Sequence, residues 1–564
     1  MIHSIPQILR AFLQGSGATI LPELELLLFA LGIFLIDRWL EAKEKHWNAA
    51  LALSGTAFSG YTLWTLRAQV AAKDSLFGFR DSILIDPFFL LFASLLLAAV
   101  ALVILFSGRA LKQRPEVSGP YHAWIMIAAA GMLLMVSGSD LVTLFLGLAI
   151  TTLSFYFLSG ISLRGRSSEV APLQSVARRY ILIWLLGPAF AASGFALLYQ
   201  LTSSSNIGRI SIVLGQRSDL ARALALSQQP GSQGESMRQL LEARMPAALQ
   251  HHLLPLEALP LLALLLILSG LFLCCVAAAS SPVILAPAPN ATVEENASVA
   301  ADAAVSALPS SAGILPASSP LSPHLAFTSI AASTAIFATL LRLLLTVFSS
   351  SQETWSYLLA GLSLLGLASA SLLAFRKITL ANFLPICCLS QFAFLLLGLV
   401  SANETAIVGV AFHLLVYVFM AAGAFTIALL LAQNPPPPEP SSDPATLYQR
   451  NPTAAYLLTL FLFSLAGIPP TGGFLAKYYI FKSLIETRHF AIAIVAGLFL
   501  LPMLYFCIRI ALTAFRKPPA ETGLPPITLT NSEAIALGIC LFVTLAAGLY
   551  PEPFQRLARY AFGQ

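Results

Sequence analysis

Charged residues are scarce in this chain of 564 residues, because Asp, Glu, Lys and Arg together make up only 10% of it. Soluble domains carry about 25% charged residues, and 57% of this chain is hydrophobic, so the composition excludes an ordinary soluble protein. The apolar residues fall into repeated runs of about 20, the length of a helix that crosses a bilayer, whereas barrel strands are about half as long. The sequence therefore predicts an all-α polytopic membrane protein.

Motifs for cofactors and metals are also absent from the sequence, which has no Rossmann fingerprint, no P-loop and no cysteine ligand set. The net charge of +5 is spread over many short connections and forms no basic face for nucleic acid. We interpret the six cysteines as small packing residues, since all of them lie inside apolar runs: Cys274, Cys275, Cys387, Cys388, Cys507 and Cys540. The chain is expected to bind no cofactor, no metal and no nucleic acid itself.

The apolar runs predict about fourteen spans, each bounded by charged, Gly or Pro residues. They begin near Ile20, Asn48, Ile85, His122, Leu141, Tyr180, Pro255, Leu325, Trp355, Thr379, Thr405, Ala454, Phe490 and Glu533. An even number of spans places both termini on one side of the membrane.

Basic residues favour one orientation of these spans. They are richest in the connections after spans one, three, five, nine and thirteen, which predicts that these connections are cytoplasmic and both termini are not. The connection after span two also carries basic residues, on the opposite side. The residues after the five odd-numbered spans are Arg38, Lys43, Lys45, Arg109, Lys112, Arg114, Arg164, Arg166, Arg376, Lys377, Arg516 and Lys517, and those after span two are Arg67, Lys73 and Arg80.

Three polar stretches interrupt the spans. Residues 203–254 are polar and are expected to hold a short amphipathic helix around residues 236–248. Residues 285–322 form an Ala/Ser/Pro tract with too little apolar bulk for a core, so we expect a disordered loop. Residues 434–440 read NPPPPEP and are expected to form a polyproline spacer within a Pro-rich loop at 434–446.

The most informative apolar run is FSLAGIPPTGGFLAK at residues 463–477. Tandem prolines remove backbone donors and glycines permit a non-helical path, so the helix is predicted to break inside the membrane. Irregular backbone at this depth is tolerated where protein or a water-filled cavity surrounds it, a typical feature of ion paths. The predicted break comprises Gly467, Pro469, Pro470, Gly472 and Gly473, and Lys477 follows it.

Lys477 is the first candidate for the proton path, the alternative being a lysine that snorkels to the interface, as is expected of Lys482. His413 is the second candidate, because histidine titrates near pH 7, although a neutral histidine bonded to a helix carbonyl is equally compatible. Arg342 is expected to be a structural cation paired with a carboxylate or carbonyl rather than a relay.

Carboxylates near the ends of spans are the remaining supporting charges. Asp140 begins the fifth span after Ser-Gly-Ser, where an N-cap is the default role. Glu23 and Glu25 lie at the start of the first span and are either interfacial anchors or charges that face a partner. The sequence does not choose between these two roles.

Three stretches in order resemble the antiporter-like membrane subunits of respiratory complex I, the NADH-quinone oxidoreductase. They are GMLLMVSGSDLVTLFLGL at 131–148, LLVYVFM at 414–420 with GAF at 423–425, and SLAGIPPTGGFLAKYYIF at 464–481. The resemblance extends over most of the chain, from LPE at 21–23 to GLYP at 548–551. Any one stretch is weak evidence, but their order and the number of spans together are strong.

The resemblance implies a fold, a function and partners. The fold would hold two inverted five-helix repeats, each with a broken helix, at 121–350 and 351–515, with flanking segments 1–120 and 516–564. The chain would help a multi-pass complex in the bacterial inner membrane to couple electron transfer to proton translocation. NADH, flavin, iron–sulfur clusters and quinone would be bound by the other membrane and peripheral subunits.

The sequence departs from the family pattern at several positions, most of them in the first repeat. The usual glutamate of the fifth span is Ala149, and the lysines of the seventh and eighth spans fall on Cys274 and Ser333. The Lys-Arg pair of the tenth span falls on Ala381 and Asn382. Because Ala, Ser and a Cys in an apolar setting cannot take and release a proton at pH 7, the first half-channel is interpreted as impaired.

Two other functions fit the same features. A subunit of a cation/proton antiporter or of a membrane-bound hydrogenase would share the broken helix, but it is expected to keep the missing glutamate and lysine. A non-conducting scaffold subunit of the same complex would need neither residue.

Overall fold

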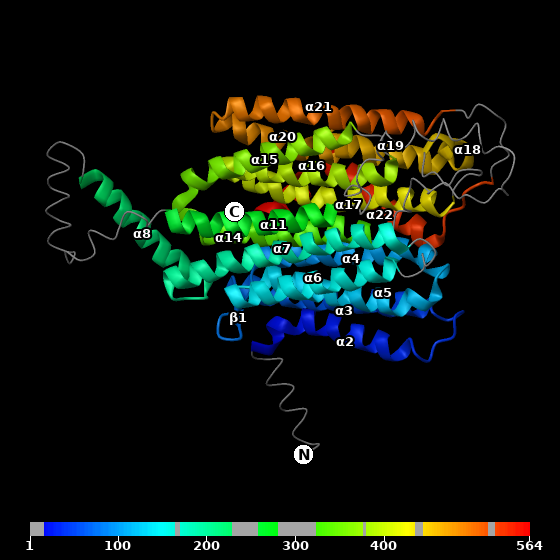
Figure 1. Ribbon diagram of the computed structural model, residues 1–564, viewed down its shortest axis with the longest axis horizontal. Coiled ribbons are helices and arrows are strands. Elements are labelled where there is room, and N and C mark those ends of the chain that lie inside the picture. Colours follow the sequence, from blue (N-terminus) through cyan, green and yellow to red (C-terminus); the bar gives the residue numbers. More distant parts are fainter. Residues whose placement is uncertain are drawn as a thin grey trace, which may run out of the picture.

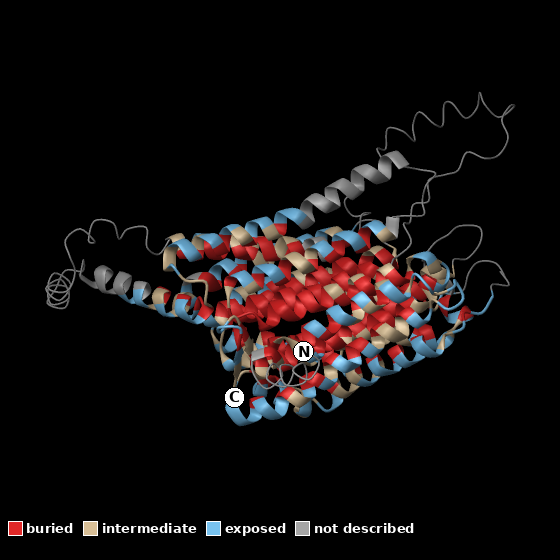
Figure 2. Cartoon of the chain, turned by 90° about the horizontal axis from the view of Figure 1, so that it is seen from below, coloured by how far each residue is buried: buried red, intermediate tan, exposed pale blue. Residues whose placement is uncertain are grey.

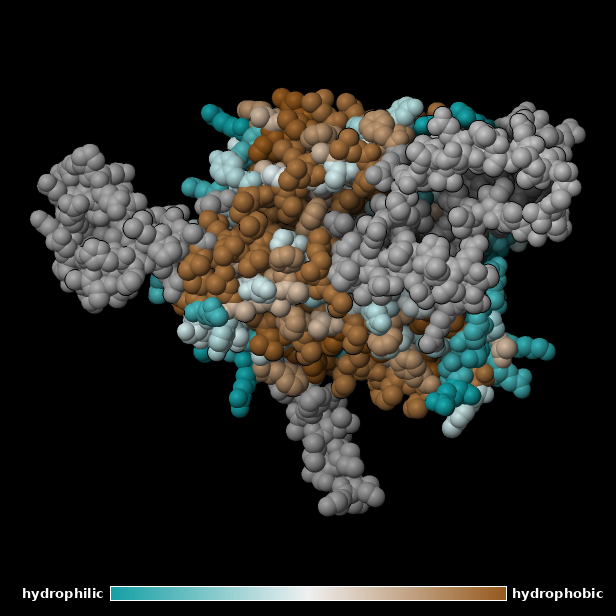
Figure 3. Space-filling model, viewed as in Figure 1, coloured by the Kyte–Doolittle hydropathy of each residue, from teal (hydrophilic) through white to brown (hydrophobic). Residues whose placement is uncertain are grey.

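The computed structural model describes residues 16–163, 170–227, 258–279, 323–375, 379–434, 444–516 and 525–563. Long helices lie side by side with their axes along the long dimension of the molecule (Figure 1). Figure 3 shows a broad hydrophobic band around the middle of the bundle, with hydrophilic residues gathered at its two ends. This distribution is the one expected of a helix bundle that spans a bilayer.

The first half of the chain forms helices joined mostly by short connections. These are η2 (Ser16–Ile20), α2 (Leu21–Ile36), α3 (Trp47–Lys73), α4 (Pro87–Lys112), η3 (Pro115–Val117), α5 (Ser118–Ser137), α6 (Leu141–Leu163), α7 (Val170–Thr202), α8 (Ile207–Ser227), α11 (Ala258–Ala279), α13 (Pro323–Phe327), the π-helical turn η4 (Thr328–Ala332) and α14 (Ser333–Thr346). A small antiparallel hairpin of β1 (Leu76–Gly78) and β2 (Ile83–Ile85) connects α3 to α4, with Phe77 opposite Leu84.

The second half continues the bundle. Its helices are η5 (Ser349–Ser351), α15 (Gln352–Ala374), α16 (Leu380–Ser401), α17 (Glu404–Gln433), η6 (Pro444–Thr446), α18 (Leu447–Arg450), α19 (Pro452–Ala466), α20 (Gly472–Glu486), α21 (Phe490–Thr513), α22 (Asn531–Leu549) and α23 (Glu552–Ala561). Burial runs through the centre of the bundle (Figure 2) and is densest along α16 and α17, which are almost entirely buried. Most side chains of the outer helix α21 are instead exposed or only partly buried.

Several helices begin at side chains that satisfy their free N–H groups. Asp86 accepts a hydrogen bond from the Phe89 amide at 2.8 Å and precedes a proline at the first position of α4. Thr530 and Glu533 form a capping box at α22, and Glu533 also accepts a hydrogen bond from Arg109 of α4 at 2.9 Å. Glu533 therefore helps to cap the start of α22 and also joins α22 to α4.

Among the described residues, eleven helices are long and apolar enough to cross a membrane. Helices α3 and α11 and the pair α19–α20 lie where the remaining expected spans begin. The ends of α2, α4 and α21, which precede basic connections, lie at one end of the bundle (Figure 1). The count of fourteen, the inverted repeats and the orientation of the termini stay predictions.

The polar inserts differ in outcome. Part of the first insert, at 207–227, is the helix α8, which projects from one end of the bundle (Figure 1). We expected a helix only further along, at 236–248, which lies outside the described residues, as do 285–322 and 435–443.

The predicted break is present, although two of its glycines have a different role. Helix α19 ends at Gly467, whose φ of +86° favours glycine, and α20 begins at Gly472. Gly472 and Gly473 therefore lie in the first turn of α20 and take no part in the non-helical path. Gly473 permits close packing instead, because a Cβ there would lie 1.9 Å from the Ser464 carbonyl oxygen.

We predict that Gly473→Ala destabilises the protein by about 1–3 kcal/mol, because the added methyl group would force α20 away from α19. Gly538→Ala in α22 is the matched control, since a Cβ there meets nothing within 4 Å. Removing a helical glycine should leave stability unchanged or slightly higher. Thermal unfolding of both variants in detergent tests this, and equal midpoints would contradict the packing argument.

Candidate functional site

Lys477 lies in α20, one turn past the break, and its side chain points back to the end of α19. Only 7% of the residue is exposed, and its Nζ donates a hydrogen bond of 2.6 Å to the Leu465 carbonyl oxygen. Carbonyls in the last turn of a helix lack an intrahelical partner and carry its negative partial charge. Lys477 is therefore held inside the protein and does not snorkel to an interface, whereas Lys482 is about half exposed beside Glu486.

The break is built to admit this side chain. A Cβ at Gly467 would lie 2.8 Å from the Lys477 Cδ, so the absence of a side chain there leaves room for the lysine stem. On the α20 side, the Gly473 amide donates to the Ser464 hydroxyl at 3.3 Å. The two half-helices thus present a carbonyl and an amide near the same lysine.

Gln391 of α16 is a functional candidate that the sequence analysis missed. Its Nε2 donates to the same Leu465 carbonyl at 3.0 Å and lies 3.9 Å from the Cys387 sulfur, while its Oε1 has no hydrogen-bond partner in the described structure. A lone glutamine within the apolar run 380–401 was the available signal. A buried amide oxygen without a hydrogen-bond partner lowers the stability of a protein, so Gln391 is a candidate for a functional role.

His413 of α17 is close to Lys477 without touching it. The Lys477 Nζ lies 6.0 Å from the centroid of the Phe394 ring, and the His413 ring lies 5.8 Å from the same centroid. The histidine is fully buried, and neither ring nitrogen has a hydrogen-bond partner within the described residues. The interpretation of His413 as bonded to a helix carbonyl is therefore wrong. A direct Lys477–His413 hydrogen bond is absent as well.

Arg342 is paired with a carboxylate, as expected of a structural cation. Its Nη2 donates to Asp86 Oδ1 at 2.8 Å, and its guanidinium carbon lies 4.6 Å from the centre of the Phe88 ring. Because Asp86 also caps α4, this ion pair fixes the end of α14 against the start of α4. The pair lies far in sequence from the broken helix, which spans α19 and α20.

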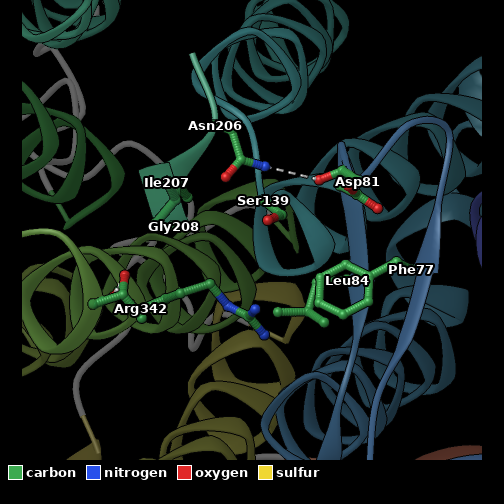
Figure 4. A pocket seen from close by; sticks show the side chains of 9 residues that line it. Phe77, Asp81, Leu84, Ser139, Asn206, Ile207, Gly208 and Arg342 are labelled. Carbon is green, nitrogen blue, oxygen red and sulfur yellow. Dashed lines mark hydrogen bonds between the residues drawn. The ribbon is translucent and has the colours of Figure 1, made fainter. Parts of the chain in front are cut away.

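Arg342 also lines a pocket of about 460 Å³ (Figure 4). Its side chain points into the pocket from α14, while the Asn206 side chain donates to the Asp81 carbonyl at 3.4 Å across the rim. The lining residues are Phe77, Asp81, Leu84, Ser139, Asn206, Ile207, Gly208, Arg342 and Thr346. Asp81 and the neighbouring Asp86 offset the arginine charge, so the pocket is not an evident anion site.

Asp140 has the predicted capping role. One oxygen accepts from the Val142 amide at 2.8 Å at the start of α6, and the other accepts from the Ser205 hydroxyl at 2.6 Å. It therefore ties the start of α6 to the connection that leads into α8.

Glu23 and Glu25 are neither interfacial anchors nor exposed charges, which corrects both sequence interpretations. They are 3% and 7% exposed and point into the packing of α2 against α3 and α5. Glu23 accepts from the Ser137 hydroxyl at 3.1 Å and Glu25 from the Thr62 hydroxyl at 2.7 Å. The sequence analysis missed this burial because the first span is apolar on all sides.

Helix α11 and residue Ser333 lie in the segment predicted to be the first repeat. Helix α11 is continuous over its described residues, Ala258–Ala279, and the break that the resemblance implies for this half stays a prediction. Cys274 packs closely against Gly187 of α7, and the Ser333 hydroxyl donates back to the Ser329 carbonyl at 2.7 Å. Cys274 and Ser333 therefore serve helix packing and backbone bonding.

Two buried histidines that the sequence analysis did not single out lie in this half of the chain. His122 of α5 bonds to the Ser118 carbonyl at 2.7 Å, and His324 is buried in α13. The first half consequently keeps titratable groups, although not at the family positions.

Comparisons with known proteins agree with this architecture. A family model described as NADH:quinone oxidoreductase/Mrp antiporter, TM, matches residues 315–501. The chain superimposes on a subunit of respiratory complex I from Thermus thermophilus with a TM-score of 0.63 at 20% identity, covering 95% of this chain and 98% of the other. A chain of the Mrp complex from Dietzia sp. gives a TM-score of 0.67 at 17% identity, covering 97% and 96%. The fold is that of an antiporter-like membrane subunit.

Sequence relatives narrow this class. The chain is 30% identical over 545 residues to NADH-quinone oxidoreductase subunit N 2 of Solibacter usitatus, covering 96% of both chains. It is 32% identical to NADH-quinone oxidoreductase subunit N 1 of Koribacter versatilis, covering 96% of this chain and 94% of the other. The chain belongs to the family of NADH-quinone oxidoreductase N subunits.

We predict that Asp86→Ala destabilises the protein by about 3–5 kcal/mol, because it leaves the buried Arg342 guanidinium without its counter-charge. Glu552→Ala is the matched control, since its partner Arg556 is 75% exposed on α23. That surface pair should contribute less than about 1 kcal/mol. Denaturation of the two variants in the same detergent measures the difference, and a similar loss in both would refute the buried-pair role.

Proposed function

We propose that this chain is a membrane-arm subunit of a proton-translocating NADH-quinone oxidoreductase. In this proposal it takes part in proton translocation, and electron transfer from NADH to quinone takes place in other subunits. The main observation in its support is that Lys477 is buried and donates a hydrogen bond to the last turn of a broken helix in the membrane. An ammonium in this setting is expensive, and such groups mark ion paths.

The surroundings of Lys477 support proton exchange more than a static role. Its recorded hydrogen bond is to one carbonyl, and a carbonyl cannot take its proton. Nearby, both ring nitrogens of His413 and the side-chain oxygen of Gln391 have no hydrogen-bond partner in the described structure. Buried polar atoms of this kind often form hydrogen bonds with water. Water there would connect groups that do not touch.

Partner subunits would hold the redox chemistry. NADH, flavin, iron–sulfur clusters and quinone would bind to other membrane and peripheral chains of the complex, and this chain would contribute none of their ligands. The complex would lie in the bacterial inner membrane, with both termini of this chain on the non-cytoplasmic side, following the distribution of basic connections.

A second candidate function is a non-conducting scaffold of the same complex. It is favoured by Ala149, Cys274 and Ser333, which stand at positions where the family pattern carries glutamate and lysine. The similarity to a chain of an Mrp complex supports the fold alone.

Native electrophoresis of a mild detergent extract tests membership of a complex. We expect the chain to migrate in a large assembly together with flavoprotein and iron–sulfur subunits, because it has no redox motif of its own. A single species of the mass of this chain, 60.2 kDa, without such partners would disprove the proposal.

Substituting Lys477 tests the role in translocation. Lys477→Met is similar in volume without the charge, so it should lower proton translocation while assembly and NADH oxidation by uncoupled membranes persist. Lys482→Met is the control, since Lys482 is a half-exposed lysine on the same helix and should change neither activity. Acidification of reconstituted vesicles, followed with a pH-sensitive dye, gives the readout. Unchanged translocation in an assembled Lys477→Met complex would favour the scaffold.

A further inference from the structure

Lys477 has fewer partners within the described residues than a buried ammonium group requires. An ammonium has three N–H donors, and the described hydrogen bond of Lys477 is to one acceptor, the Leu465 carbonyl oxygen, at 2.6 Å. The ion pairs of the described residues all involve other side chains. Because a buried ammonium needs a counter-charge or several acceptors, a further acceptor is expected close to Nζ.

Gln391 of α16 offers such an acceptor. The residue is 1% exposed, and its Oε1 has no hydrogen-bond partner within the described residues. Its Nε2 donates to the Leu465 carbonyl at 3.0 Å, the same oxygen that the Lys477 Nζ contacts. The two nitrogens are therefore separated by no more than the sum of their distances to this oxygen. Since a lysine ends in a flexible four-carbon stem, rotation about its last bonds brings Nζ within reach of Oε1.

The orientation of the Gln391 amide is fixed by its surroundings. Nε2 faces the Leu465 carbonyl, and the opposite orientation of the amide would place two acceptor oxygens against each other. The Cys387 sulfur, one turn earlier on α16, lies 3.9 Å from the same Nε2. Oε1 is consequently turned away from the Leu465 carbonyl and remains free for another donor.

The Leu465 carbonyl keeps a partner when the lysine moves away. A carbonyl oxygen has two lone pairs, and this one accepts from both Gln391 and Lys477. After Nζ leaves, Nε2 still donates to it, so no carbonyl at the helix end loses its last donor inside the membrane. The adjacent turn of α16 also faces the lysine, because the Phe394 ring centroid lies 6.0 Å from Nζ.

We propose that Gln391 is a positioning residue that gives Lys477 two sites. In the first, Nζ donates to the Leu465 carbonyl, as in the structure. In the second, Nζ donates to the Gln391 Oε1, while the Gln391 Nε2 keeps its bond to Leu465. The lysine keeps its protons in this movement, and the glutamine neither gains nor loses one. The inference rests on the proposed role of Lys477 in translocation and adds the group that lets the ammonium leave the helix end.

Infrared spectroscopy of the Gln391 side-chain carbonyl tests the second site without relying on activity. Isotope-labelled glutamine separates side-chain bands from backbone bands, and subtracting a Gln391→Met variant isolates one residue. Gln391→Asn serves for the subtraction if Gln391→Met does not assemble. A carbonyl that accepts from an ammonium is polarised and absorbs at lower frequency. Lys477→Met should therefore move the isolated band to higher frequency, and an unchanged band would overturn the proposal.

A double-mutant cycle on thermal unfolding tests the shared carbonyl. Each single variant, Lys477→Met or Gln391→Met, leaves one side-chain donor on Leu465, whereas the double variant leaves none. The double variant should therefore unfold about 1–3 °C below the midpoint that the two single shifts predict. Additive shifts would show that the two donors do not share the carbonyl, which contradicts the proposal.

Proton translocation by Gln391→Met supplies the functional arm. Without Oε1 the ammonium is confined to the Leu465 carbonyl, so translocation should fall to the level of Lys477→Met in an assembled complex. Ser363→Ala is the matched control, because the buried Ser363 hydroxyl donates to the Ala393 carbonyl of α16 at 2.7 Å. It removes a hydrogen bond of the same kind without touching the lysine site and should leave translocation unchanged.

The outcomes separate this inference from the proposed function. Full translocation by Gln391→Met together with loss in Lys477→Met would reject the positioning role and leave the lysine role intact. Full translocation by Lys477→Met would reject the lysine role in translocation. In that case the infrared band still decides whether Nζ occupies the second site.

Discussion

The broken helix depends on one constraint: inside a bilayer, every polar group must find its partner within the protein. The end of α19 leaves carbonyl groups in its last turn without a partner in the helix. Side chains from two other helices donate hydrogen bonds to one of them. Lys477 and Gln391 both donate to the Leu465 carbonyl, and the Ser464 hydroxyl accepts the Gly473 amide. The same bonds that make the interruption possible also hold a lysine amine beside a glutamine amide inside the protein, so structure and chemistry at this site are not separable.

Charges are distributed differently at the ends of the bundle and at its centre. Towards the ends, Arg109–Glu533 and Arg342–Asp86 are complete ion pairs, and each acid also caps a helix. These pairs fix helices to each other. At the centre, Lys477 lacks an acidic partner. A static role needs a complete pair, whereas proton exchange needs a partner that can lose and regain the proton.

Much of the fold could be predicted from the sequence because its cause is local. Apolar runs of bilayer length predict spanning helices, and tandem prolines with Gly467 predict where α19 must end. The roles of two site residues could be predicted from residue type and position. Arg342 lies in a span, where a cation requires a partner, and Asp140 precedes a helix that it can cap. The role of Gly472 and Gly473 was misassigned, because glycine permits both an irregular path and close packing, and only the distance to Ser464 distinguishes them.

The sequence by itself determined the class of protein, the position of the break and the presence of a lysine beside it. Tertiary structure decided what surrounds that lysine. Gln391 and Phe394 of α16 and His413 of α17 lie on two different helices, and their apolar surroundings in sequence look alike. In a helix that is apolar on every side, periodicity does not reveal which face is turned inward. That Gln391 shares a carbonyl with the lysine, and that Glu23 is buried, therefore follow only from how the helices pack.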